Sequence, residues 1–301
     1  MHIQRILLAL ALLLPATVRA DTAAGLAALA RGDLAGGRVL LQVAASEGDA
    51  EAAYQVGLIY DAGRGVPADP AQALKWFTQA AEAGHAEAAR VVGIYYEEGK
   101  GVAQDHTQSA RWYGRAANAG NAKAQRNLGS AYALGRGVPR DYEQAARWFR
   151  AAADQGNADA QRNLAYLYFF GRGVPRDEAR ATELFAAAAS ANADGAGKAD
   201  YALGFSYYNG RGVERDFAAA LAHFKVAANK GNADAQIFLA RMYLNGEGTA
   251  KDPFQSYYWA LLGGLQKPEL AAYYFDELRP LLTDADRAAV RRGLSEFTPD
   301  G

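Results

Sequence analysis

The heptapeptide GRGVPRD occurs at residues 135–141 and again, letter for letter, at residues 171–177. Its glycines would suit either a phosphate-binding loop or a turn between helices. A phosphate-binding loop needs Gly, four further residues and then Gly-Lys-Ser/Thr, and this sequence lacks that spacing. The Gly-x-Gly element instead recurs at intervals of 36, 36, 36, 39 and 36 residues, beginning at Gly63, Gly99, Gly135, Gly171, Gly210 and Gly246. This periodicity indicates the turn of a tandem-repeat protein.

The residues before each Gly-x-Gly predict a first helix, which we name helix A. In the third repeat an alanine, a Leu-Gly pair and a tyrosine stand at Ala124, Leu128, Gly129 and Tyr132. Spacings of four, five and eight residues place these side chains on one face of a helix. All six repeats carry the alanine and the tyrosine at these positions.

The residues after each Gly-x-Gly predict a second helix, named helix B. In the third repeat Trp148 and Ala152 share one helical face. Asp141 is expected to cap the start of this helix, and Gln144 to complete a capping box with its side chain. Gly156 stands where a left-handed residue commonly ends a helix. The chain is therefore predicted to be an all-α, right-handed α-solenoid in which stacked helix pairs share a continuous core.

The consensus of residues 124–156 resembles the Sel1-like repeat, a relative of the tetratricopeptide repeat. We expect a degenerate N-terminal capping helix pair at 21–48 and C-terminal capping helices and a tail at 268–301. The six repeats between them are expected at 49–84, 85–120, 121–156, 157–195, 196–231 and 232–267.

The resemblance implies a non-catalytic scaffold for protein–protein contacts, often in the cell envelope of Gram-negative bacteria. An alternative is a scaffold for assembly of envelope polysaccharide or peptidoglycan. Some cysteine-rich relatives bind or hydrolyse β-lactams, which makes an enzyme of that kind a further alternative. This chain contains no cysteine and so lacks their paired cysteines.

The first 20 residues have the features of a secretory signal peptide. A weakly basic start is followed by the apolar run at 6–14, Pro15 and a small residue, Ala20, before the expected cleavage at Asp21. The apolar run is shorter than the roughly 20 residues of a membrane-spanning helix. We therefore expect an exported protein without a stable membrane anchor, located in the periplasm.

Composition excludes several kinds of chemistry. The formal net charge of −1 argues against a nucleic-acid partner, and the absence of cysteine excludes thiol catalysis. His85, His106 and His223 lack the spacing of metal ligands, and His223 replaces the tryptophan of a helix B, where packing is its simplest role. No catalytic, metal or cofactor residue is predicted.

Related helical repeats use helix A to line a concave face, and this analogy selects candidate partner-binding residues. Aromatic and arginine side chains dominate the set, as they do in interaction hot spots. The alternative is that the rings pack on each other as core. A bound protein or peptide, or an envelope glycan, is the expected partner. The candidate residues are Arg126, Arg162, Tyr166, Phe169, Phe170, Tyr201, Phe205, Tyr208, Asn209, Arg241 and Asn245.

Overall fold

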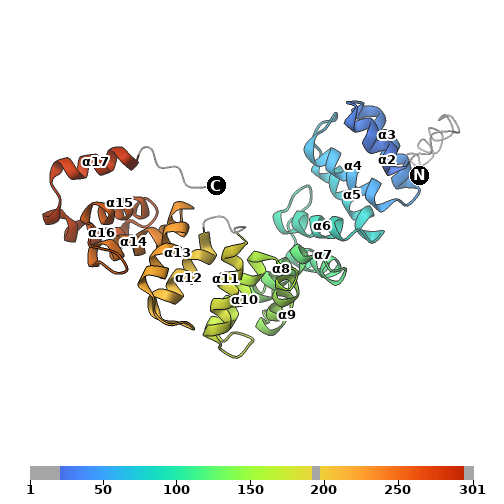
Figure 1. The fold of residues 1–301 in the computed structure, drawn as a ribbon. Helices are drawn as coiled ribbons and strands as arrows, with labels where there is room; N and C mark the ends of the chain where they lie inside the picture. Colours follow the sequence, from blue (N-terminus) through green and yellow to red (C-terminus); the bar gives the residue numbers. More distant parts are fainter. Residues whose placement is uncertain (1–20, 192–196, 295–301) are drawn as a thin grey trace. The chain divides into compact units, whose positions relative to one another are not determined.

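The computed structural model describes residues 21–191 and 197–294, so the expected signal peptide lies outside the described residues. Within these ranges the regular elements are all helical. The chain divides into two compact units, one ending at Ala152 and the other beginning at Ala153. In each unit consecutive helices pack as hairpins (Figure 1). The predicted all-α solenoid of helix pairs is confirmed.

The first unit begins with the hairpin of α2 and α3, which precedes the first Gly-x-Gly repeat. Helix A of the first three repeats is α4, α6 and α8, and helix B is α5, α7 and α9. The helices are α2 (Thr22–Ala30), α3 (Leu34–Ser46), α4 (Ala50–Ala62), α5 (Pro70–Glu82), α6 (Ala86–Glu98), α7 (His106–Asn118), α8 (Ala122–Leu134) and α9 (Tyr142–Ala153), whose last residue opens the second unit.

The second unit continues the alternation, with α10, α12 and α14 as helix A and α11, α13 and α15 as helix B. Two further helices follow, and α16 and α17 both pack on α15. The elements are α10 (Ala158–Phe170), α11 (Glu178–Ser190), α12 (Lys198–Asn209), α13 (Phe217–Asn229), α14 (Ala233–Asn245), α15 (Pro253–Gly264), α16 (Pro268–Leu278), the 3₁₀ turn η2 (Arg279–Leu281) and α17 (Asp284–Leu294).

Side-chain caps start most of the A helices. Asn121 accepts a hydrogen bond from the backbone N–H of Ala124 at 2.9 Å, and Asn157 and Asn232 do the same for α10 and α14. In the second repeat His85 replaces asparagine, and its Nδ1 lies 3.0 Å from the N–H of Ala88. An acceptor at this position satisfies one of the N–H groups that the first helical turn leaves unpaired.

The cap of helix B differs from the expected capping box. Asp141 does accept the backbone N–H of Gln144, at 3.0 Å. The second bond of a capping box would bring the Gln144 side chain to the N–H of Asp141, but this N–H donates to the carbonyl of Tyr132 at 3.0 Å instead. Equivalent bonds to a helix A tyrosine occur in all six repeats. The glutamine is therefore dispensable, which explains why Arg180 and Ala219 replace it after Asp177 and Asp216.

The two glycines of each Gly-x-Gly have different tasks. The first, such as Gly135 with φ of 71°, is the left-handed residue that ends helix A. The second lies against the start of helix B in the preceding repeat. A Cβ on Gly137 would stand 1.9 Å from the carbonyl oxygen of His106, and one on Gly212 would stand 2.1 Å from that of Glu178. Only glycine permits this approach between backbones.

The core runs between the two helix layers of each unit. In helix A the small member of the aliphatic–small pair faces the aromatic of helix B, so that a Cβ on Gly129 would overlap the ring of Phe149. Phe77 in the first unit and Phe224 in the second are fully buried in this way. These core contacts fix which face of each helix A remains outside the core.

The contact of the second glycine gives a direct test. Gly137→Ala is expected to destabilise the protein by about 1–3 kcal/mol of overpacking, in addition to about 1–2 kcal/mol for alanine in a left-handed conformation. Gly120→Ala is the matched control, because Gly120 has φ of 86° but open space around its Cβ position. Urea unfolding followed by circular dichroism measures both. Equal losses from the two variants would show that the close approach contributes nothing.

Candidate functional site

An open pocket lies between the A helices of the fourth and fifth repeats, in the second unit. Its volume is about 360 Å³. The walls are aromatic, with Arg211 supplying a charge. We name it the α10–α12 pocket, and its residues are Tyr166, Phe169, Phe170, Phe185, Tyr201, Ala202, Phe205 and Arg211.

The pocket exists because of where the repeat places large side chains. Tyr166 and Phe205 hold one position of helix A, where the third repeat has Ser130. Tyr201 holds the position of Arg126 and Arg162. These substitutions turn a mixed polar face into an aromatic one. Ala202 and the buried ring of Phe185 also line the pocket.

Ring contacts join the two sides of the pocket. Phe169 lies 5.1 Å from Phe170 and 6.4 Å from Phe205, measured between ring centroids. Tyr166 meets Phe185 edge-on at 5.0 Å. Such edge-to-face pairs contribute stabilisation in addition to that from burial of their surface. The walls are therefore held in place before any ligand arrives.

A second set of rings continues from the pocket along α12 and α14. Phe238 contacts both Phe205, at 6.1 Å, and Tyr201, at 6.0 Å. It also contacts Tyr208 at 5.4 Å and stacks on the core ring of Phe224 at 4.8 Å. Burial raises the pKa of the Tyr201 hydroxyl to about 12, and the charge of Asp234 adds to the rise. Tyr201 is therefore neutral at physiological pH and contributes an apolar ring.

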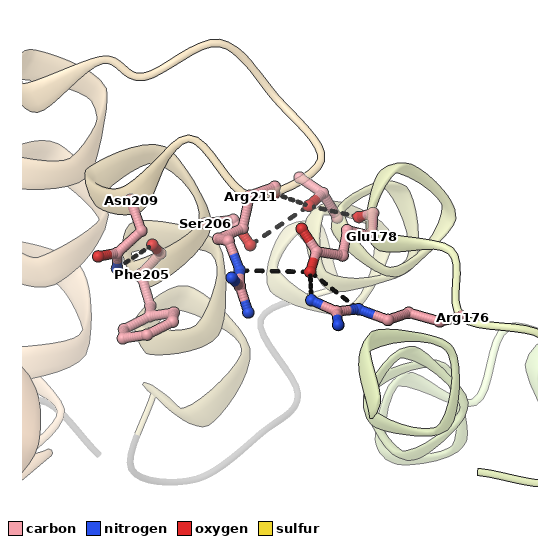
Figure 2. A network of polar contacts seen from close by, with 7 residues as sticks. Arg176, Glu178, Phe205, Ser206, Asn209 and Arg211 are labelled. Atoms are coloured by element: carbon pink, nitrogen blue, oxygen red, sulfur yellow. Dashed lines mark hydrogen bonds and ion pairs between the residues drawn. The ribbon is translucent and has the colours of Figure 1, made fainter. Parts of the chain in front are cut away.

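A network of charged side chains reaches the α10–α12 pocket through Arg211 (Figure 2). Arg211 follows α12 and lies with its guanidinium 5.3 Å from the ring centre of Phe169. Its Nε is 3.3 Å from the carboxylate of Glu178, the first residue of α11, and Arg176 contacts the same carboxylate. A helix N-terminus favours a carboxylate, and Glu178 in addition attracts these two guanidinium groups.

The sixth repeat replaces the arginine with an acid. Glu247 accepts a hydrogen bond from the hydroxyl of Tyr208 at 2.7 Å, and this bond adds to burial in raising the pKa of Tyr208. Arg241 lies 3.7 Å from Glu247, and the amide of Asn245 donates to it at 3.4 Å. A neighbouring pocket of about 290 Å³ is lined by Arg241, Asn245, Tyr273 and others.

A smaller and more polar pocket lies in the first unit, with a volume of about 90 Å³. Arg126 and Ser130 of α8 line it together with Glu97 of α6. Glu97 accepts the hydroxyl of Tyr113 at 2.5 Å, and burial together with this bond raises the pKa of Tyr113. Arg126 is the one predicted binding residue that belongs to the first unit.

The predicted binding residues of the second unit divide by exposure. Phe169 and Tyr208 are core side chains, with only 9% and 7% of their surface exposed. Phe170 is 56% exposed, and Tyr166, Tyr201 and Phe205 are partly exposed at the pocket walls. The remaining polar candidates are Arg162, which pairs with Asp159 at 2.9 Å, Arg241 and Asn245 near Glu247, and Asn209, whose amide donates to the carbonyl of Phe205 at 2.9 Å. Phe169 and Tyr208 therefore pack as core, and the other aromatic candidates keep exposed surface.

Sequence reasoning missed Arg211, Glu247 and Phe238. Arg211 and Glu247 stand between the two glycines of the turn. The sequence predicted only a turn-forming role for this position. The signal was present, since this position is basic in five repeats and acidic in the sixth. Phe238 comes one residue before Leu239, which holds the aliphatic position that recurs in every repeat. The aromatic character of Phe238 was the available signal.

No cluster of metal-ligating side chains occurs in the described part of the chain. His223 stacks on Tyr207, with its Nδ1 3.3 Å from the buried carboxylate of Asp200. Among the described residues, no helix is long and apolar enough to cross a membrane. The feature that stands out chemically is therefore the aromatic pocket with its charged edge.

These features define a tandem-repeat solenoid with an aromatic pocket on its A helices. The Sel1 repeat family model matches residues 50–85, 86–121, 122–157, 158–192, 197–232 and 233–267, and the chain belongs to this family. Sel1 repeats generally form non-catalytic scaffolds for protein interactions. No curated protein matches the sequence.

Two solved structures show the similarity in three dimensions. A protective antigen of uropathogenic Escherichia coli strains is 30% identical, with a TM-score of 0.73 over 86% of this chain. The chain spans 59% of that antigen's length. A Sel1 repeat protein from Oxalobacter formigenes is 28% identical, with a TM-score of 0.71 over 82% of this chain and 97% of its own.

The division between core and pocket residues predicts unequal effects of two neighbouring substitutions. Phe169→Ala is expected to cost about 3 kcal/mol, because it removes a buried ring. Phe170→Ala is expected to cost less than about 1 kcal/mol, because its ring is mostly exposed. Thermal and urea unfolding measure both. Similar losses would mean that Phe170 also belongs to the core.

The raised pKa of Tyr201 predicts a specific loss of stability in alkali. Below pH 10 the hydroxyl is protonated in the folded and unfolded chain alike. Between pH 10 and about pH 12 the unfolded chain releases this proton first, so the free energy of unfolding falls. Tyr201→Phe lacks the titrating group. Its stability relative to the natural protein should therefore rise across this interval, as urea unfolding at each pH would show. A constant difference would contradict the assignment.

Proposed function

We propose that this chain is a non-catalytic interaction scaffold of the bacterial cell envelope. It binds a peptide segment of a partner protein on the A helices of its second unit. The α10–α12 pocket is the centre of the binding surface, and the face of α14 around Arg241 and Asn245 extends it. The signal-like segment at residues 1–20 supports export to the periplasm.

One observation carries the proposal, namely that bulky aromatic side chains line an open pocket of about 360 Å³ without filling it. Phe170 exposes 56% of its surface at this pocket. Exposed aromatic area of this kind is costly in water and marks interaction sites. Aromatic and arginine residues also supply most of the binding energy in protein interfaces.

Two further features support a protein partner. The walls are prearranged by the ring contacts of Phe169 with Phe170 and Phe205, which lowers the entropy that binding costs. The antigen of uropathogenic Escherichia coli is described as protective, which fits a protein of this architecture acting outside the cytoplasm.

Site-specific photocrosslinking in a Gram-negative host tests the proposal. A benzophenone amino acid at Phe170 or at Asn209 is expected to give a defined adduct with a partner protein in the periplasmic fraction. Val226 of α13, which is 43% exposed, provides the control position and should give no such adduct. The exported chain should begin at Asp21, as N-terminal sequencing would show.

Three results would contradict this function. Equal adducts at Phe170 and Val226 would show that the pocket has no special role. Retention of the chain in the cytoplasm would exclude the envelope. An adduct degraded by glycosidases but resistant to proteases would favour the glycan-binding alternative.

A further inference from the structure

The polar pocket of the first unit occupies the same place in the repeat as the α10–α12 pocket of the second unit. We name it the α6–α8 pocket, after the A helices of the second and third repeats. Counting by the repeat spacings of 36 and 39 residues matches the lining residues of the two pockets one by one. The matched pairs are Glu97 with Phe169, Tyr113 with Phe185, Arg126 with Tyr201, Asn127 with Ala202, Ser130 with Phe205 and Arg136 with Arg211.

The two pockets differ in chemistry although they share a position. In every matched pair except the last, the α6–α8 pocket carries the more polar side chain. Ser109 and Tyr113, which also line it, are 3% and 2% exposed, so hydroxyl groups stand at its buried side. The hydroxyl of Tyr113 donates to Glu97 at 2.5 Å. The same arrangement of helices therefore builds a polar pocket in one unit and an aromatic pocket in the other.

Three side chains of the α6–α8 pocket have no partner in the described part of the chain. They are those of His106, Asn127 and Arg136, which form neither a hydrogen bond nor an ion pair there. Arg126, in contrast, already interacts with other groups of the protein. A concave site in which a few polar groups converge without partners is typical of a ligand site, because a ligand can satisfy them.

The charges in the α6–α8 pocket restrict the kind of group that it can hold. Glu97 is hydrogen-bonded to a hydroxyl that remains protonated, because burial and this bond raise the pKa of Tyr113. A ligand carboxylate would therefore meet a charge of its own sign at Glu97, and a ligand ammonium would meet one at Arg136. A carboxamide is neutral, and it offers both N–H donors and a carbonyl acceptor.

We propose that the α6–α8 pocket binds the carboxamide of an Asn or Gln side chain in the partner segment. The amide N–H groups donate to Glu97, and the carbonyl oxygen accepts from Arg136 or Asn127. The volume of about 90 Å³, against about 360 Å³ for the α10–α12 pocket, suits the head of a side chain rather than a ring. This site lies in the other unit and rests on the proposed function only in taking the partner to be a peptide.

Selection of random peptides displayed on phage, against the full chain, tests this specificity. The binders are then compared on Asn127→Ala and Ser130→Phe, which introduce the residues that Ala202 and Phe205 supply at the matched positions, so helix A is expected to accept both. Peptides that lose binding to both variants should contain Asn or Gln. Replacing that residue in a synthetic peptide by Ala, Glu or Lys should weaken binding about tenfold, as measured by fluorescence anisotropy.

Three further variants serve as controls. Arg111→Gln changes an exposed arginine of α7 that does not line the pocket, and it should leave affinity unchanged. Arg136→Gln should weaken the same peptides as Asn127→Ala, because it removes a donor to the amide oxygen. Phe170→Ala identifies the peptides that use the α10–α12 pocket instead. Thermal unfolding followed by circular dichroism verifies that each variant is folded.

The outcomes separate this inference from the proposed function. Peptides that depend on Phe170 but never on Asn127 or Ser130 would overturn the inference and leave the proposed function standing. Peptides that depend on Asn127 but not on Phe170 would support the inference and contradict the proposed binding centre. A preference for Asp, Glu, Lys or Arg among the Asn127-dependent peptides would overturn the carboxamide specificity. Binding of an N-acetylated oligosaccharide through Asn127, without peptide binding, would assign the pocket to a glycan amide and contradict the proposal.

Discussion

The close approach of backbone to backbone at the second glycine of each turn is the constraint on which the repeat depends. Gly101, Gly137, Gly212 and Gly248 each lie where a side chain would overlap the start of helix B in the preceding repeat. This contact sets the spacing between consecutive repeats. It also fixes the orientation of the turn, so that Lys100, Arg211 and Glu247, each between two such glycines, contact helix A of the preceding repeat.

The chemistry of the proposed binding face follows from that orientation. Because the turn cannot rotate, chemical variation is confined to the side chain between the glycines and the helix A residues opposite it. The same backbone therefore carries an ion pair at Lys100 and Asp61 and a cation–π contact at Arg211 and Phe169. The aromatic pocket is a local variation in side chains on a constant frame.

The sequence predicted the order and the ends of the helices well, because the repeat period and the helix-capping residues are local properties. The A helices end at the first glycines, and Asn121, Asn157 and Asn232 cap the starts of three of them. The second bond of the capping box was wrong, since the N–H of Asp141 reaches back to the carbonyl of Tyr132 across the turn. Exposure was harder to predict. Phe169 and Phe170 are adjacent in sequence, yet contacts with a helix of the next repeat bury only the first. Arg211 was missed for the same reason, because its partners Phe169 and Glu178 lie in another repeat.

The bond between Asp141 and Tyr132 has a consequence for how the chain folds. It closes a short loop and joins two helices by backbone atoms alone, so a helix hairpin can form before its neighbours are in place. Contacts such as that of Asp61 with Lys100 then join residues about one repeat apart. A chain built from such contacts has a low contact order, and its structure can grow outward from whichever hairpin forms first.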